Sequence, residues 1–385
     1  MIKRKICVVI TARPSYARVK TALYAIKNHP DLELQLVLAG SALLDRYGDA
    51  SKVIEADGFK VIEKIYNVLE GEAPGIMAKI TGLAIMELST TFQNLKPDLV
   101  VTIADRFETI ATSIAASYQN IPLAHIQGGE VTGNIDEKVR HANTKLADIH
   151  LVASEDARKR VIRLGESERY VINTGCPSMD LAKEVLENSN FDFNPLIKYG
   201  GVGSEIKWHD GYVVVMQHPV TTELDATKKD IEATLNAIYE LNIPTFWFWP
   251  NVDAGSDSLS KGIRAFREKH QAKNIHYFKN MEPIDFLKLI KNSKCLIGNS
   301  SVGIRESAFL GIPVVNIGTR QHGRQRAKSV IDCNHDKDQI KSSVNAQLKH
   351  GSYEPEFIYG NGLAGQKIAA TLATIDLIFH KTITY

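Results

Sequence analysis

Short apolar runs rich in β-branched residues alternate with amphipathic segments along most of the chain. The first of them predict a strand at Ile6–Ile10, a helix at Ala17–Asn28 and a second strand at Leu32–Leu38. Strands that alternate with helices of this length are typical of right-handed βαβ units in a parallel sheet. The pattern also predicts the following elements: strands Leu99–Ile103, Pro122–Ile126 and Ile149–Ala153, and helices Phe107–Tyr118, Glu137–Leu146 and Glu155–Leu164.

The alternation stops between residues 188 and 210, where Asn, Gly and Pro are frequent, and then begins again. The second half is predicted to contain these elements: strands Tyr212–Met216, Thr245–Trp249, Ile275–Phe278, Cys295–Ile297, Val314–Ile317 and Ser329–Ile331, and helices Leu224–Leu241, Leu259–Lys269, Pro283–Ile290 and Val302–Leu310. We therefore predict an α/β protein with two Rossmann-like, doubly wound parallel-sheet domains, residues 1–175 and 176–362. Residues 363–385 have helical apolar spacing and are expected to pack back on the first domain.

Composition and charge exclude several classes of function. The chain is 44% hydrophobic and 23% charged, as expected for a globular protein, and its formal net charge is +2. No long Lys/Arg stripe suits a nucleic acid, and no apolar run reaches the roughly 20 residues of a membrane span. The apolar run after the basic residues 3–5 is expected to be the first strand and not part of a signal peptide. The four cysteines show no paired spacing, so we expect buried free thiols and a cytoplasmic protein.

The stretch Gly298–Glu306 carries the most informative chemistry. It follows an apolar run and leads into a helix-forming segment. The free N–H groups and the dipole of such a helix start attract anions, above all phosphate. Ser300 and Ser301 add hydroxyl donors, and Glu306 is placed to accept hydrogen bonds from a sugar diol. This suits a nucleoside diphosphate, although an ordinary helix capped by serine is the alternative.

Ionisable residues also follow two predicted strands of the first half, where an open parallel sheet binds its ligands. Asp105 comes directly after one strand, either as a helix cap or as a carboxylate that acts as acid or base. The glycine-bearing loop after the next strand brings Glu130, Asp136 and Arg140, and Arg140 is one helical turn from Asp136. This density of ionisable groups is unusual for a plain connection and indicates a site.

Four further strand ends carry polar side chains: Arg13; His218; Asn251, Asp253 and Ser256; and Arg320. The arginines suit phosphate, and the histidine suits phosphate binding or protonation of a leaving group, whereas surface loops or a structural histidine are the alternatives. The chain has no Gly-x-Gly-x-x-Gly fingerprint, no Walker loop, no nucleophile elbow and no zinc-ligand spacing. We therefore expect neither a metal nor a dinucleotide cofactor.

Taken together, the short sequence motifs at these strand ends resemble those of the hydrolysing UDP-N-acetylglucosamine 2-epimerases over nearly the whole chain. The resemblance rests on Asp105-Arg106-Phe107-Glu108, Gly128-Gly129-Glu130, Asp136-Glu137, Arg140-His141, Thr144-Lys145, His218-Pro219, residues 250–256, Gly298–Glu306 and Ile317–Arg324. It implies the GT-B architecture, with a nucleotide sugar in a cleft between two Rossmann-like domains. It also implies a homodimer or homotetramer that needs no cofactor.

The implied reaction begins when UDP leaves carbon 1 of the sugar while the proton on carbon 2 is removed. Water then adds to the resulting 2-acetamidoglucal with inverted configuration at carbon 2. The products are N-acetylmannosamine, the starting compound of sialic acid synthesis, and UDP. By the family match, Asp105 and Asp136 are the acid and base, and Arg140 orients Asp136. The expected contacts of the nucleotide sugar are Arg13, His218, Asn251, Asp253, Ser256, Ser300, Ser301, Glu306 and Arg320.

Two positions depart from the family pattern. Many members carry a catalytic Glu two residues after the His of the strand predicted here at Pro122–Ile126. At this place the present chain has His125-Ile126-Gln127. Because Gln is not a general base, Glu130 replaces it, or the role is dispensable, or the substrate differs. At Gly40-Ser41-Ala42, relatives often have His after the Ser.

Four alternative functions follow from the same residues. The first is the same reaction on UDP-2,4-diacetamido-2,4,6-trideoxyglucose or a GDP-linked analogue, on the way to legionaminic acid. A non-hydrolysing epimerase is disfavoured, because its typical His-Val-Glu-Ala-Gly-Leu-Arg string is replaced here. A GT-B glycosyltransferase lacks a recognisable acceptor motif, and Gln127 leaves open a catalytically inactive nucleotide-sugar sensor.

Overall fold

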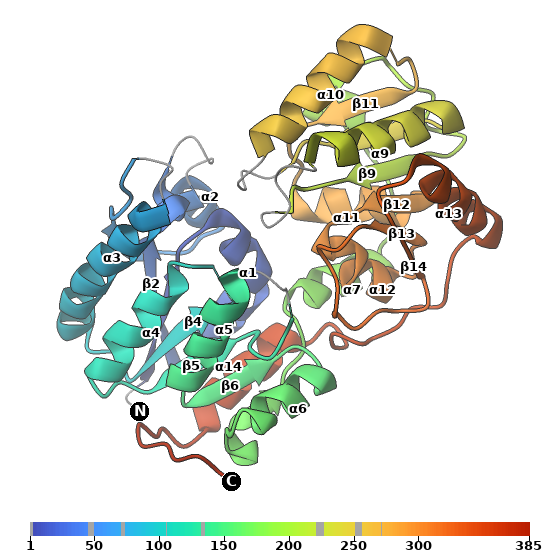
Figure 1. Ribbon diagram of the computed structural model, residues 1–385. Helices are drawn as coiled ribbons and strands as arrows, with labels where there is room; N and C mark the ends of the chain where they lie inside the picture. Colours follow the sequence, from blue (N-terminus) through green and yellow to red (C-terminus); the bar gives the residue numbers. More distant parts are fainter. Residues whose placement is uncertain are drawn as a thin grey trace. The chain divides into compact units, whose positions relative to one another are not determined.

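The computed structural model contains two compact units, each built around one seven-stranded sheet (Figure 1). It describes residues 3–44, 50–70, 74–104, 106–131, 135–220, 227–250, 256–270 and 272–385. Unit 1 comprises Met1–Asp180 together with Tyr359–Tyr385, and unit 2 comprises Leu181–Ile358. Within the described ranges, no helix has the length and hydropathy needed to cross a membrane.

The sheet of unit 1 is parallel throughout, with the strand order β3-β2-β1-β4-β5-β6-β7. Its strands are β1 (Arg4–Ile10), β2 (Leu32–Ala39), β3 (Val61–Ile65), β4 (Leu99–Ile103), β5 (Leu123–Ile126), β6 (Ile149–Val152) and β7 (Val171–Asn173). Its helices are α1 (Arg13–Asn28), α2 (Ala50–Ala56), α3 (Pro74–Leu95), α4 (Thr109–Tyr118), α5 (Ile135–Leu146), α6 (Glu155–Arg163) and α14 (Ala364–Thr374), and α7 (Ser178–Glu187) crosses into unit 2. The strand order reverses between β1 and β4, which is where such sheets bind ligands.

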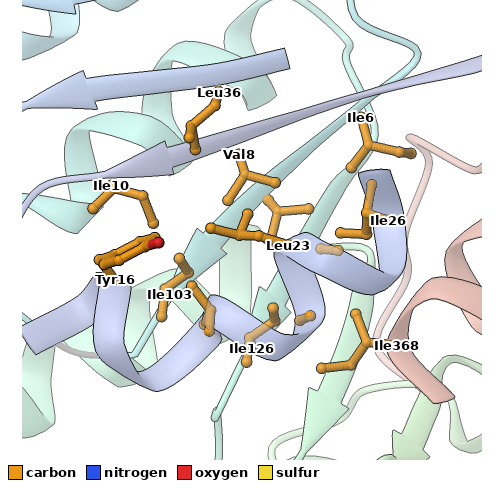
Figure 2. Packing of buried hydrophobic residues seen from close by; sticks show 14 of the residues in the cluster. Ile6, Val8, Ile10, Tyr16, Leu23, Ile26, Leu36, Ile103, Ile126 and Ile368 are labelled. Carbon is orange, nitrogen blue, oxygen red and sulfur yellow. The ribbon is translucent and has the colours of Figure 1, made fainter. Parts of the chain in front are cut away.

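Alternation along β1 divides the core of unit 1 into two layers. Ile6, Val8 and Ile10 face α1, where they meet Leu23 and Ile26 (Figure 2). The residues between them on β1 point to the opposite face, which α3 and α4 cover. Each Leu or Ile side chain buried in this way stabilises the fold by roughly 1.5–3 kcal/mol. Helix α14 adds Ile368 to the α1 layer, so the last helix completes the core of unit 1.

The sheet of unit 2 has the order β14-β13-β12-β9-β10-β11-β8, in which only β8 runs antiparallel to its neighbour. Its strands are β8 (Val202–Gly203), β9 (Val213–Met216), β10 (Thr245–Phe248), β11 (Ile275–Phe278), β12 (Cys295–Gly298), β13 (Val314–Ile317) and β14 (Val330–Cys333). Its helices are α8 (Pro195–Tyr199), α9 (Thr227–Leu241), α10 (Ser256–His270), α11 (Pro283–Lys291), α12 (Glu306–Leu310) and α13 (Lys337–His350). The strand order reverses between β9 and β12.

These two sheets confirm the predicted α/β class with two doubly wound halves. The four cysteines are free, and Cys333 alone is not fully buried. Two predicted helices are shorter than expected. The helix predicted near the C-terminus, α14, ends at Thr374, because Ile375 takes an extended conformation. The segment predicted as a helix at Val302–Leu310 is a 3-10 turn (Ser301–Gly303) followed by α12.

The C-terminal tail is attached to unit 1 by an ionic cluster around the buried Glu166. Lys381 Nζ donates to the carbonyl oxygens of Lys145 and Ala147, at 2.9 and 2.6 Å, at the C-terminal end of α5. The same ammonium lies 2.5 Å from Glu166 Oε2, and Lys145 Nζ lies 2.6 Å from Glu166 Oε1. His150 Nε2 also lies 3.1 Å from this carboxylate, which is only 3% exposed. The tail therefore caps α5 and neutralises Glu166.

We expect Glu166→Gln to lower the free energy of unfolding by about 3 kcal/mol at pH 7. Burial alone would raise the pKa of Glu166, but hydrogen bonds from His150, Lys145 and Lys381 outweigh burial and lower it from 4.5 to about 2. Because the folded-state pKa is the lower one, this stabilisation is present above pH 4.5 and is lost as the pH falls toward 2. Urea unfolding at pH 7 and pH 3 measures it.

The control for this experiment is Glu168→Gln, since the Glu168 side chain is 70% exposed and its ion pair with Arg158 is accessible to water. The stability difference between wild type and Glu166→Gln should shrink at pH 3, and that of the control should stay small at both pH values. An equal difference at both pH values for Glu166→Gln would contradict the prediction.

Candidate functional site

The carboxyl end of β4 leads directly to the first predicted carboxylate. Ala104 has a φ of +58°, an uncommon left-handed conformation for a residue with a side chain. Its N–H donates to Ile126 O at 2.9 Å, and its carbonyl lies 2.9 Å from His125 Nε2. Asp105 itself lies outside the described residues, so the structure fixes the backbone that precedes it.

The predicted glycine-bearing loop and α5 bring buried charged groups together. Arg140 is 1% exposed, and its Nη1 donates to Glu130 O at 2.7 Å and lies 3.5 Å from Glu137 Oε2. Glu130 is 6% exposed. Asp136 is half-buried in the first turn of α5, one turn before Arg140, where the helix dipole favours a negative charge. The loop and the helix are thus held to each other by the guanidinium of Arg140.

Arg13 is the first residue of α1 and is half-buried, three residues after the carboxyl end of β1. Pro14 occupies the next position, where its missing N–H is not needed by the helix. The structure therefore places Arg13 beside the point where the strand order of unit 1 reverses.

In unit 2, β9 and β12 approach closely where the strand order reverses. Gly298 has a φ of +127°, and a Cβ added to it would lie 2.1 Å from Met216 O. The next residue, Asn299, ties the two strand ends together. Its N–H donates to Met216 O at 3.0 Å, its Oδ1 accepts from His218 N at 2.7 Å, and its Nδ2 donates to His218 O at 2.9 Å. Glycine is required at position 298 for both space and backbone conformation.

The turn at residues 299–303, which we call the Ser300 turn, is bonded to the side chain of an arginine. Arg320 Nη1 donates to Asn299 O at 3.1 Å. Ser300 Oγ caps the following turn by accepting from Val302 N at 3.4 Å, and Ser301 is half-buried beside it. Burial, and then the charge of Arg320, lower the pKa of His218 to about 3, so that its ring is neutral at pH 7. The neutral ring therefore has one donor and one acceptor nitrogen and carries no positive charge.

The remaining predicted residues are placed only in part. Glu306 begins α12 and is half-buried, and its Oε2 has no hydrogen-bond partner in the part of the chain that the structure describes. Asn251 and Asp253 lie outside the described residues. Ser256 is the first residue of α10, and its side chain is not described. Among the described residues, no cluster of His, Cys, Asp and Glu is arranged to hold a metal ion.

The model of the UDP-N-acetylglucosamine 2-epimerase family matches residues 24–373. The chain belongs to this family. It is 30% identical to UDP-N,N'-diacetylbacillosamine 2-epimerase (hydrolyzing) of Legionella pneumophila, over 97% of each chain. It is 33% identical to GDP/UDP-N,N'-diacetylbacillosamine 2-epimerase (hydrolyzing) of Campylobacter jejuni, over 99% of each chain. A third relative, UDP-N-acetylglucosamine 2-epimerase of Neisseria meningitidis, is 30% identical over 94% of this chain and 92% of its own.

Solved structures of this epimerase family share the fold. The UDP-GlcNAc 2-epimerase of Neisseria meningitidis bound to UDP-GlcNAc has a TM-score of 0.77 at 18% identity, covering 96% of this chain and 99% of that chain. The enzyme of Methanocaldococcus jannaschii in complex with UDP-GlcNAc and UDP has a TM-score of 0.77 at 17% identity, with the same coverage. The predicted family and the two-domain GT-B fold class are therefore confirmed.

Gln127, at the position where many members of the epimerase family have a catalytic Glu, makes a contact that the sequence did not predict. The residue has a φ of +66° and is 2% exposed. Its Nε2 donates to Cys176 Sγ at 3.0 Å, and Cys176 Sγ lies 3.0 Å from Ser178 Oγ. The Gln127 amide is therefore part of a buried polar chain that links β5 to the start of α7.

Proposed function

We propose that the protein is a hydrolysing 2-epimerase that converts UDP-N-acetylglucosamine and water into N-acetylmannosamine and UDP. The observation that carries this proposal is that each unit has its own set of polar and charged groups beyond the carboxyl ends of its parallel strands. Unit 1 presents Arg13 and the carboxylate-bearing helix α5, and unit 2 presents the Ser300 turn with Arg320 tied to it. Elimination of a diphosphate needs both proton transfer at the sugar and stabilisation of the leaving anion.

Unit 2 is proposed to bind the nucleotide. Ser300, Ser301 and Arg320 hold phosphate, because hydroxyls and a guanidinium suit an anion. Arg13 is proposed as a further phosphate contact. Glu306 accepts hydrogen bonds from the ribose diol. The unpartnered buried Oε2 of Glu306 supports this role, since a buried acceptor without a partner costs about 1–3 kcal/mol. Asn251, Asp253 and Ser256 are proposed as further substrate contacts.

Unit 1 is proposed to move the protons. Asp105 and Asp136 are the acid and base, and Arg140 positions the loop and helix that carry Asp136. Glu130 is proposed to take the role of the catalytic Glu that many family members carry at the position of Gln127. Arg140 Nη1 donates to the Glu130 carbonyl oxygen at 2.7 Å and so fixes the backbone of this residue. His218, neutral at pH 7, donates one hydrogen bond to the departing diphosphate. This elimination and hydration need no redox cofactor, and a homodimer or homotetramer is expected from the family resemblance.

The second candidate is the same reaction on UDP-2,4-diacetamido-2,4,6-trideoxyglucose, which is UDP-N,N'-diacetylbacillosamine, or on its GDP-linked analogue. The Legionella and Campylobacter relatives, named for this sugar and for hydrolysis, favour it. Gln127 supports a changed sugar site only indirectly, since its side chain binds Cys176.

The test is incubation of the purified protein with each of these nucleotide sugars in D₂O and identification of the products by NMR. A hydrolysing epimerase releases free nucleoside diphosphate and a reducing 2-epimeric sugar that carries deuterium at carbon 2. An epimer still attached to its nucleotide would show the non-hydrolysing reaction. Binding without turnover of any of the sugars would show a sensor and would reject the proposal.

We expect Gln127→Glu to lower the midpoint of thermal unfolding without raising the rate of UDP release. The variant removes the amide donor to Cys176 and places a carboxylate at a site that is 2% exposed. Loss of a buried hydrogen bond with an unsatisfied partner costs about 1–3 kcal/mol. The measurement is a melting curve with a coupled assay for UDP. A variant that turns over faster than wild type would show that position 127 still reaches the reacting sugar.

A further inference from the structure

His125 connects two elements that carry proposed catalytic residues. It lies in β5 and is 0% exposed. Its Nε2 is 2.9 Å from Ala104 O, at the end of β4, and its Nδ1 is 3.1 Å from Thr144 Oγ1, on α5. Because a carbonyl oxygen only accepts, Nε2 carries the proton, and Nδ1 accepts from the threonine hydroxyl. The imidazole is thus neutral, with both nitrogens satisfied.

The first partner of this ring is a strained backbone. Ala104 has a φ of +58°, a conformation that costs an L-residue roughly 1–2 kcal/mol. Two hydrogen bonds hold it: its N–H donates to Ile126 O at 2.9 Å, and its carbonyl accepts from His125. The peptide bond after Ala104 leads to Asp105. The orientation of that peptide bond therefore depends on the imidazole.

The second partner of the imidazole, Thr144, is on α5, the helix that carries the proposed catalytic Asp136. Thr144 is 0% exposed and lies one turn after Arg140 on α5. Gly128 shows that space around this contact is restricted, because a Cβ there would lie 2.9 Å from both His125 Nδ1 and Thr144 Oγ1. The backbone of Gly128 is outside the left-handed region, so glycine is needed at this position for room alone.

We propose that His125 is a positioning residue, a neutral imidazole that fixes the backbone before Asp105 relative to α5. The inference rests on the proposed function for the roles of Asp105 and Asp136. Burial lowers the pKa of His125 to about 4, which keeps the ring in this donor and acceptor pattern at neutral pH. A charged ring would donate from both nitrogens and would force the Thr144 hydroxyl to turn away.

The experiment compares Thr144→Val with Thr144→Ser. Valine keeps the volume and removes the donor to His125 Nδ1, whereas serine keeps the donor and loses a methyl group. We expect Val to lower kcat of the nucleotide-sugar reaction about 10-fold or more with KM within about twofold, and Ser to restore kcat. Ser113→Ala is the control, since it removes a different buried hydrogen bond to α5, in which Ser113 Oγ of α4 donates to Asn143 Oδ1 at 2.7 Å. It should lower stability and leave kcat within about twofold.

A readout independent of activity accompanies these kinetics. Hydrogen–deuterium exchange of peptides covering residues 99–112 should speed up in Thr144→Val and not in Thr144→Ser. Unchanged exchange, or faster exchange with wild-type kcat, would overturn the positioning role. If the wild-type protein shows no turnover of any nucleotide sugar, the proposed function fails, and the exchange rates still decide whether His125 holds the Ala104 backbone.

Discussion

Replacing Asp136 by Asn is expected to lower the rate of UDP release at least 100-fold while the dissociation constant for UDP changes less than about threefold. Loss of a general acid or base typically costs about 10²–10⁴-fold in rate. The side chain is half-buried in the first turn of α5, so the substitution is small and the helix is retained. UDP affinity is expected to persist because the proposed nucleotide contacts belong mainly to other elements.

The measurement is a continuous assay for UDP, with calorimetric titration of UDP against the same preparation. Asp156→Asn is the matched control, because Asp156 is also half-buried in the first turn of a helix, α6. It removes the same favourable interaction with the helix dipole, worth about 0.3–1 kcal/mol, and none of the proposed chemistry. Equal rates for the two variants would remove Asp136 from the mechanism.

Replacing Gly298 by Ala is expected to weaken UDP binding at least 100-fold. A Cβ at this position would lie 2.1 Å from Met216 O, which is backbone, and a φ of +127° is closed to L-residues. The strand end must therefore move, and Asn299 and Ser300 move with it. Those residues position the turn that we propose to bind the phosphates.

Calorimetry with UDP checks this prediction, and circular dichroism and thermal melting report whether unit 2 is still folded. Gly82→Ala is the control: Gly82 lies inside α3, and nothing is within 4 Å of the added Cβ. We expect that substitution to stabilise the protein by about 0.5–1 kcal/mol and to leave UDP affinity unchanged. Wild-type UDP affinity in a folded Gly298→Ala protein would place the phosphates elsewhere.

The parts of the fold that could be predicted from the sequence are those with a local pattern. Strands buried on both faces are mostly apolar, so runs such as Cys295–Gly298 identify the sheets directly. Glycine and charged residues at strand ends identify candidate sites, because the carboxyl ends of parallel strands meet at one edge. The long helix α3 was missed, since its apolar residues are spread around several faces and include the exposed Met86.

The contacts between side chains could not be predicted, because they join residues that are distant in the chain. Gln127 and Cys176 are 49 positions apart, and His125 and Ala104 are 21 apart. Nothing in the local pattern shows that His125 has two partners or that Gln127 faces a thiol. Arg140 was expected beside Asp136, and the structure adds a bond to the Glu130 backbone that only the loop geometry creates.

The return of the chain to unit 1 after unit 2 has a consequence for biosynthesis. Leu372 is buried in the core of unit 1, and Arg4 donates to the carbonyl oxygens of Leu372 and Ile375, at 2.6 and 3.0 Å. During translation the first strand leaves the ribosome long before these partners exist. The side of α1 that packs against α14, around Thr21 and Ala22, therefore stays uncovered until α14 has been synthesised, and nascent chains that stall beyond unit 2 should be substrates for chaperones.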